Sequence, residues 1–149
     1  MILTFACSAM VLVLVPPLCT PGYADVERDE HCMLQKELNL PVYQWADPLK
    51  PSSAIIVVIH GMTLYSGLFD QAARYLAGNG YPIYAVDLRG FGRWWAEGKK
   101  DVDFGQSEKD IVNLATALRN AYPHVPVFVL GESLGGNIAI KITCRDPSV

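Results

Sequence analysis

The chain has 149 residues, of which 51% are hydrophobic and 18% are charged, a balance typical of one globular unit with a buried core. The net charge of -3 and the scattered Lys and Arg residues give no basic surface, so nucleic acid is excluded as an expected partner. The absence of an internal repeat or a heptad pattern in the sequence excludes a solenoid and a coiled coil.

The first 24 residues differ in character from the rest. Ile2–Val15 is almost wholly apolar, and two prolines follow it. Small residues then occupy the two positions that a signal peptidase inspects, directly before a charged run. We therefore predict a signal peptide at residues 1–24, cleaved after Ala24, and a secreted or periplasmic protein formed by residues 25–149. No Lys or Arg precedes the apolar stretch, so an uncleaved N-terminal anchor remains the alternative.

Two cysteines would remain after cleavage, Cys32 in a polar lead-in and Cys144 near the end of the chain. They could form a disulfide in an oxidising compartment or remain buried free thiols. His31 stands beside Cys32, but no second Cys/His pair occurs at the spacing of metal ligands. We expect no metal and no cofactor.

The rest of the chain alternates between strand and helix patterns. Short apolar or β-branched runs predict strands at residues 42–45, 54–60, 83–86 and 127–130. Apolar residues at helical spacing predict helices at residues 69–76, 107–122 and 134–144. The middle helix is expected to start at Ser107, where Ser107 and Asp110 form an S-x-x-D pattern, after a loop that contains Gly and Trp. Because parallel neighbours need a long return connection, this order predicts an α/β fold, a mostly parallel sheet with helices on both faces.

A serine motif follows the strand at 127–130. Gly131–Gly136 reads G-x-S-x-G between a strand and a helix, which is the context of a nucleophile elbow. A Cβ at Gly131 or Gly135 would crowd the backbone in so tight a turn. Ser133 would then stand exposed at the N-terminus of the helix, where free N–H groups favour negative charge, and it is our candidate nucleophile.

A second motif, His60-Gly61-Met62-Thr63, ends the strand at 54–60. We expect the backbone N–H groups of Met62 and Leu134 to form an oxyanion hole, because one donor should follow this strand and the other should follow the nucleophile. His60 ends a buried strand and precedes Ser133 in the chain, so we interpret it as a structural, hydrogen-bonded residue rather than a base.

A third motif, Asp87–Gly92, forms a polar turn after the strand at 83–86. Its G-x-G lacks the third Gly of a dinucleotide loop, and the chain has no P-loop Lys-Ser/Thr. We expect Asp87 and Arg89 to hold this turn by hydrogen bonds and an ion pair.

In this order, the three motifs resemble those of the α/β-hydrolase superfamily, and the chain from Val42 to Cys144 is similar to its monoacylglycerol lipase, lysophospholipase and serine aminopeptidase group. The resemblance implies a secreted or surface esterase that acts on lipid acyl esters or other small-molecule esters, in which Ser133 attacks the carbonyl. It is also compatible with association at a membrane surface.

The chain departs from the family pattern after Ser133, because only Asp146 and no histidine follows it. In the family, the triad Asp and His and a lid come later in the chain, so all three would fall beyond Val149. We therefore expect the N-terminal part of such a domain, with an exposed sheet edge and little or no turnover of activated esters. An aminopeptidase, an acyl transferase and a non-catalytic interaction module remain alternatives.

Overall fold

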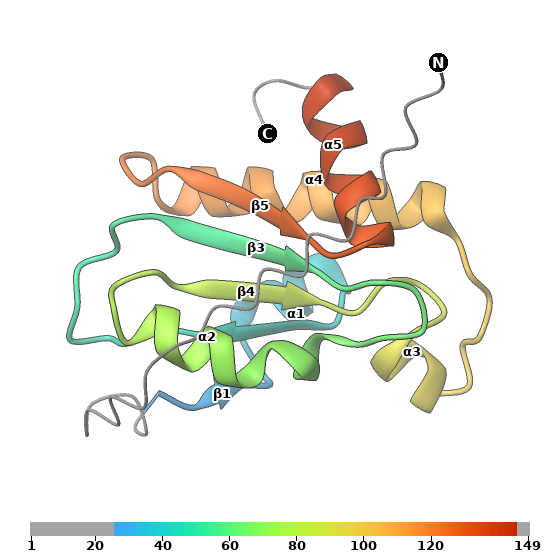
Figure 1. The fold of residues 1–149 in the computed structure, drawn as a ribbon, viewed down its shortest axis with the longest axis horizontal. Coiled ribbons are helices and arrows are strands. Elements are labelled where there is room, and N and C mark those ends of the chain that lie inside the picture. Colours follow the sequence, from blue (N-terminus) through green and yellow to red (C-terminus); the bar gives the residue numbers. More distant parts are fainter. Residues whose placement is uncertain (1–25, 146–149) are drawn as a thin grey trace, which may run out of the picture.

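The computed structural model describes residues 26–145, and the predicted signal peptide at residues 1–24 and Asp146 lie outside this range. The elements in chain order are β1 Arg28–Asp29, α1 Met33–Leu38, β2 Val42–Trp45, β3 Ile55–Ile59, the 3₁₀ helix η1 Ser66–Phe69, α2 Asp70–Ala77, β4 Ile83–Val86, α3 Gly92–Ala96, α4 Phe104–Ala121, β5 Val127–Gly131 and α5 Leu134–Arg145 (Figure 1).

The strands form one sheet in the order β1-β2-β4-β3-β5. β3 pairs in parallel with both β4 and β5, whereas β2 is antiparallel to both of its neighbours, β1 and β4. All of these strands except β2 therefore run in the same direction. The prediction of a mostly parallel sheet is confirmed.

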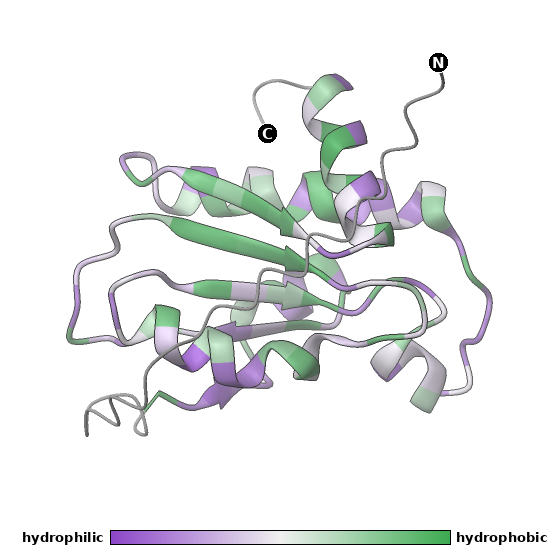
Figure 2. Ribbon diagram, in the orientation of Figure 1, coloured by the Kyte–Doolittle hydropathy of each residue, from purple (hydrophilic) through white to green (hydrophobic). Residues whose placement is uncertain are grey.

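Helices cover both faces of this sheet, which confirms the predicted α/β architecture. On one face, α1, α4 and α5 pack on alternate side chains of β3, and Ile111 and Leu114 of α4 are completely buried there. On the other face, α2 contributes Ala73 and Ala77 to a smaller core with Val58 of β3. Figure 2 shows the apolar character of β3 and β5. A strand covered on both faces explains the unbroken β-branched run of β3.

β5 forms one edge of the described sheet and is covered on one face only. Phe128 and Leu130, which point to the face that carries α2, are 56% and 53% exposed. The expected exposed edge is thus found at this strand.

The start of α4 differs from the prediction. The helix begins at Phe104 rather than at Ser107, because the side chain of Asp103 caps it by accepting a hydrogen bond from Gln106 N at 2.8 Å. Ser107 lies inside the helix and donates its hydroxyl to Asp103 O. The predicted S-x-x-D start was therefore wrong, since Asp103 performs the capping.

Four short elements were not predicted, namely β1, α1, η1 and α3. α1 lies in the polar lead-in, and α3 lies in the segment expected to be a loop. Cys32 is buried ahead of α1, Cys144 is exposed, and both are free thiols, so the structure contains no disulfide between them. No helix within residues 26–145 is long and apolar enough to cross a bilayer.

Candidate active site

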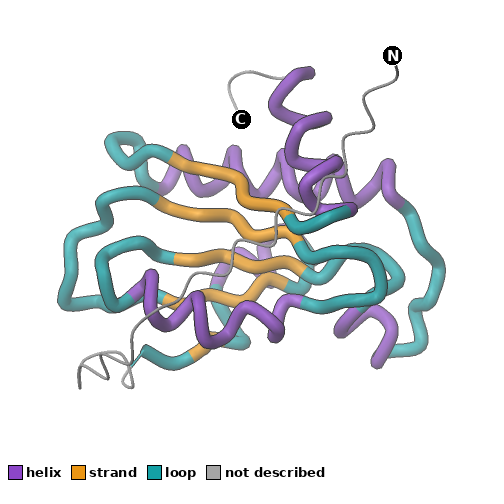
Figure 3. The backbone as a smooth tube through the Cα atoms, viewed as in Figure 1, coloured by secondary structure: helices purple, strands orange, loops and turns teal. Residues whose placement is uncertain are grey.

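The candidate site lies at the carboxyl ends of β3, β4 and β5. The loops that follow these strands meet at one edge of the sheet, where parallel α/β sheets hold their ligands (Figure 3). Met62 follows β3, Asp87 follows β4, and Ser133 and Leu134 follow β5.

Ser133 stands in a tight turn between β5 and α5. Its side chain is exposed and its φ is 51°, in the left-handed region that few non-glycine residues adopt. The turn is closed by Gly135 N, which donates to Glu132 O at 2.8 Å. It is tied to β3 by Glu132 N, which donates to Ile59 O at 3.0 Å. The backbone thus holds the serine hydroxyl away from the core.

The two glycines that flank this turn leave no space for a side chain. A Cβ on Gly131 would lie 2.2 Å from the backbone of Gly135, and a Cβ on Gly135 would lie 2.2 Å from Ile59 O. The expected crowding at both positions is confirmed. The G-x-S-x-G spacing therefore reflects a close approach of α5 to the ends of β5 and β3.

The loop after β3 passes directly beside this turn. A Cβ on Gly61 would lie 3.5 Å from both Ser133 Cβ and Glu132 O. Within residues 26–145, neither Met62 N nor Leu134 N donates a hydrogen bond to another group. The structure therefore brings Gly61, the residue before Met62, next to Ser133, and the Met62 side chain is 55% exposed.

His60 is fully buried, and both of its ring nitrogens are engaged. Nε2 accepts a hydrogen bond from Leu88 N at 3.0 Å, so Nδ1 carries the proton and donates to Gly61 O at 2.7 Å. Burial lowers the pKa of His60 below its ordinary value of 6.5, which favours the neutral ring. The expectation of a structural His60 is confirmed by these contacts.

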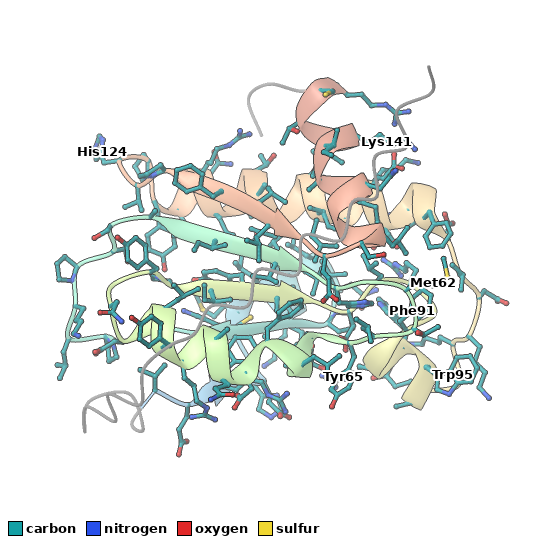
Figure 4. All side chains as sticks on the ribbon, in the orientation of Figure 1. Met62, Tyr65, Phe91, Trp95, His124 and Lys141 are labelled. Carbon is teal, nitrogen blue, oxygen red and sulfur yellow. The ribbon has the colours of Figure 1, made fainter. Side chains whose placement is uncertain are left out.

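The other two histidines lie far from Ser133. His124 precedes β5, at the opposite end of this strand (Figure 4). His31 follows β1, which is separated from β5 by three strands, or roughly 19 Å at the usual spacing between strands. All three histidines of the chain fall within the described residues, and none is placed to take a proton from Ser133.

Asp87 is a buried carboxylate at the centre of the neighbouring loops. It accepts hydrogen bonds from Ser66 N and Arg93 N, both at 2.8 Å, and from the Tyr43 hydroxyl at 3.3 Å. Burial, together with the charge of Asp87, raises the pKa of Tyr43 to about 12, so the phenol remains a donor. Gly92 has a φ of 53°, and a Cβ there would lie 2.2 Å from Asp87 Cγ. This glycine is required for the carboxylate to reach α3.

Arg89 forms the expected ion pair, but its partner is on α4. Its guanidinium donates two hydrogen bonds to the carboxylate of Asp110, at 2.7 and 3.1 Å, and its Cζ lies 4.2 Å from the ring centroid of Trp94. The sequence contained a signal for this partner, because Asp110 falls on the same helical face as the buried Ile111 and Leu114. A carboxylate in an apolar stripe requires a charged partner.

A cavity beside the Asp87–Gly92 turn was not predicted, and Tyr65, Phe91 and Trp95 form part of its lining. Within residues 26–145, no group of three or more His, Cys, Asp or Glu side chains could hold a metal ion.

These features define an α/β-hydrolase fold. Solved structures support the fold: a thermostable carboxyl esterase from Bacillus coagulans aligns with a TM-score of 0.66 at 23% identity, covering 73% of this chain and 36% of the esterase. A soluble variant of the monoglyceride lipase from Saccharomyces cerevisiae aligns with a TM-score of 0.57 at 24% identity, covering 70% of this chain and 35% of the lipase.

The family follows from the sequence comparison. Residues 50–149 match the family described as serine aminopeptidase, S33, and the chain belongs to this family. Human monoglyceride lipase is 35% identical over 102 residues, covering 67% of this chain and 33% of the lipase. A monoacylglycerol lipase from Mycolicibacterium smegmatis is 29% identical over 106 residues, covering 71% of this chain and 38% of that enzyme. The chain thus spans less than half the length of these relatives and is similar to their monoglyceride lipase-like group.

Proposed function

We propose that this protein is a serine hydrolase that cleaves carboxylic esters of lipids, with Ser133 as the nucleophile. The observation that carries the proposal is the exposed Ser133 at a positive φ, beside Gly61 and at the start of α5. The similarity to enzymes named monoglyceride lipase and monoacylglycerol lipase supports an acyl ester as the substrate.

In the proposed reaction, the Ser133 hydroxyl oxygen attacks the carbonyl carbon of the ester and loses its proton to a base. The carbonyl π electrons move to oxygen, and the resulting oxyanion accepts hydrogen bonds from Met62 N and Leu134 N. Collapse of this intermediate expels the alcohol, which takes up the proton. Water then attacks the acyl-enzyme and releases the acid and the free serine.

The base and its carboxylate partner are proposed to come from outside residues 26–145, because no histidine in this range reaches Ser133. A serine hydroxyl without a base is a weak nucleophile. We therefore expect the 149-residue chain to hydrolyse p-nitrophenyl acetate barely above the buffer rate. Turnover that the Ser133→Ala variant abolishes would contradict this expectation.

The nucleophile can be tested without turnover, by reaction with a fluorophosphonate and mass spectrometry of the product. We expect the adduct on Ser133 and no adduct in Ser133→Ala, whereas Ser53→Ala, which alters an exposed serine ahead of β3, should react like the wild type. Because a missing base slows this reaction, Ser133→Cys supplies a second arm. Its thiolate needs no base and should be acylated by p-nitrophenyl acetate faster than the thiol of Ser53→Cys. Equal rates for the two thiols would refute the assignment.

Residues 1–24 are further proposed to direct secretion. N-terminal sequencing of the exported protein should begin at Asp25, and a protein that retains Met1 would support the anchored alternative.

A further inference from the structure

A cavity of about 540 Å³ opens beside the Ser133 turn, and the reaction scheme above does not use it. Its walls come from the loop after β3, from the start of α3 and from the segment ahead of α4. The lining residues are Thr63, Leu64, Tyr65, Gly90, Phe91, Gly92, Trp95 and Val102. Figure 4 shows Tyr65, Phe91 and Trp95 at the same end of the sheet as Met62.

The walls of this cavity are mainly apolar and aromatic. No charged side chain lines it, and the hydroxyl of Thr63 is already engaged with Met62 O at 2.6 Å. The Tyr65 hydroxyl and the indole N–H of Trp95 are the remaining polar side-chain groups in the lining. Such a cavity gains free energy from an apolar ligand group but offers few partners to the hydroxyls of a polyol.

The cavity is held open by buried contacts. The Asp87 carboxylate accepts a hydrogen bond from each of two walls. Ser66 N donates from the wall that contains Tyr65, and Arg93 N donates from the start of α3. The Phe91 ring stands edge-on to the buried His60 ring, with 5.8 Å between the centroids. These contacts preform the site, which lowers the entropic cost of binding.

The cavity adjoins the serine turn through one side chain. Leu64, which lines the cavity, places its Cδ1 3.3 Å from the position of a Cβ on Gly61, and Ser133 Cβ lies 3.5 Å from that same position. Leu64 therefore forms the part of the cavity wall that lies toward Ser133.

We infer that this cavity binds an apolar arm of the ester substrate, a phenylalkyl or short branched alkyl group, and that Tyr65, Phe91 and Trp95 determine this specificity. The inference rests on the proposed function and extends it, since it assigns the group beside the reacting ester. The volume of the cavity is in the usual range of small-molecule sites. The glycerol part of a monoglyceride would have to lie elsewhere.

Tryptophan fluorescence gives a readout that does not depend on catalysis. Trp45 and Trp94 are buried, whereas Trp95 lines the cavity and is 56% exposed. Titration with 4-phenyl-1-butanol should shift the emission of the wild-type chain saturably, and Trp95→Phe should remove this signal. Glycerol should give no saturable change.

Two variants place a charge in the cavity, Val102→Asp and Tyr65→Asp, at side chains exposed enough to leave the core intact. Each should weaken binding of 4-phenyl-1-butanol by about tenfold or more, because the ligand would desolvate the carboxylate. Leu49→Asp, which alters a side chain that is 92% exposed and outside the cavity, is the matched control and should bind like the wild type. Wild-type affinity in either cavity variant, or no saturable change in the wild type, would overturn the inference.

Ser133→Ala separates this inference from the proposed function, and it should bind the alcohol with unchanged affinity. If the alcohol binds but the fluorophosphonate adduct falls on another residue, the cavity assignment stands and the nucleophile assignment fails. If Ser133 is labelled but the alcohol does not bind, the opposite holds.

Discussion

The conformation of Ser133 is set by its neighbours rather than by its own side chain. A non-glycine residue in the left-handed region is strained by roughly 1–2 kcal/mol, and the fold must stabilise the turn enough to offset this. Gly131 and Gly135 make this possible because they let α5 start directly above the ends of β5 and β3. The pattern of two glycines around a serine is thus a consequence of packing at this site.

Substitution of Gly131 by Ala tests this packing. The new Cβ would lie 2.2 Å from the backbone of Gly135, so we expect a loss of about 1–3 kcal/mol in the free energy of unfolding. Urea denaturation measures the change. Gly105→Ala is the matched control, because its Cβ would meet nothing closer than 3.5 Å and Ala is favoured in helix α4. Equal stabilities of the two variants would contradict the packing described for the turn.

His60 predicts a dependence of stability on pH. Its pKa is lowered in the folded protein, so between the ordinary value of 6.5 and the folded value the unfolded chain binds more protons. Its contribution to stability is therefore fully present above pH 6.5 and decreases as the pH falls towards the folded pKa. Urea denaturation from pH 8 to pH 5 should show a smaller decrease in His60→Gln than in the wild type. The same decrease in both proteins would show that His60 does not titrate in this way.

At the scale of elements, the four longer strands were predictable, whereas β1 and the short helices were not. The apolar run of β3 indicates a strand, because its length and its β-branched content suit a strand covered on both faces. α3 has only five residues, too few for helical periodicity, and it forms because Arg93 N and Trp94 Nε1 both donate to Asp87. Those contacts join residues six and seven positions apart across a turn, so the periodicity of a helix carries no signal for them.

The start of α4 was mispredicted because two capping patterns overlap. Both Asp103 and Ser107 precede apolar helical positions, so either residue could cap the helix. A cap at Ser107 would need Asp110 as its partner, but the Asp110 carboxylate pairs with Arg89, and Asp103 caps the helix instead. The position of the loop after β3 was easier to predict, because the end of a parallel strand locates it without any knowledge of side-chain contacts.

The cap of α4 gives a prediction at this scale. Asp103→Ala removes the acceptor of Gln106 N and should lower the free energy of unfolding by about 1 kcal/mol. Asp101→Ala, which removes an exposed carboxylate from the same segment, should change stability by less than about 0.5 kcal/mol. Thermal and urea unfolding of both variants measure the difference. A larger loss in Asp101→Ala than in Asp103→Ala would show that the cap lies elsewhere.

At the scale of the whole molecule, the described sheet is asymmetric. β5 has a free edge within residues 26–145, and its exposed Phe128 and Leu130 form an apolar surface on the face of the sheet that carries α2. Edge strands of this kind pair with other chains.

We therefore expect the 149-residue chain to self-associate with increasing concentration. Leu130→Lys should raise the dissociation constant by about tenfold or more, since burial of one such side chain contributes about 1.5–3 kcal/mol. Sedimentation velocity over a concentration series measures this. Leu49→Lys, at a side chain that is 92% exposed and away from β5, should associate like the wild type. A monomeric wild type at all concentrations would contradict the prediction.

The site as a whole depends on loops from three strands meeting at one edge. Each of the three motifs could be recognised in the sequence by itself, because each follows its own strand. The cavity between Tyr65, Phe91 and Trp95 could not be predicted. Its shape depends on how Asp87 joins the loop after β3 to α3, which is a tertiary contact between distant residues.

The central claim is that the turn holds the Ser133 oxygen beside two free backbone amides. The most direct measurement is a crystal structure of the chain after reaction with a fluorophosphonate. We expect the phosphonyl oxygen of the Ser133 adduct at about 2.7–3.1 Å from both Met62 N and Leu134 N. An adduct whose phosphonyl oxygen faces solvent, more than about 4 Å from either nitrogen and thus beyond hydrogen-bond reach, would contradict the claim.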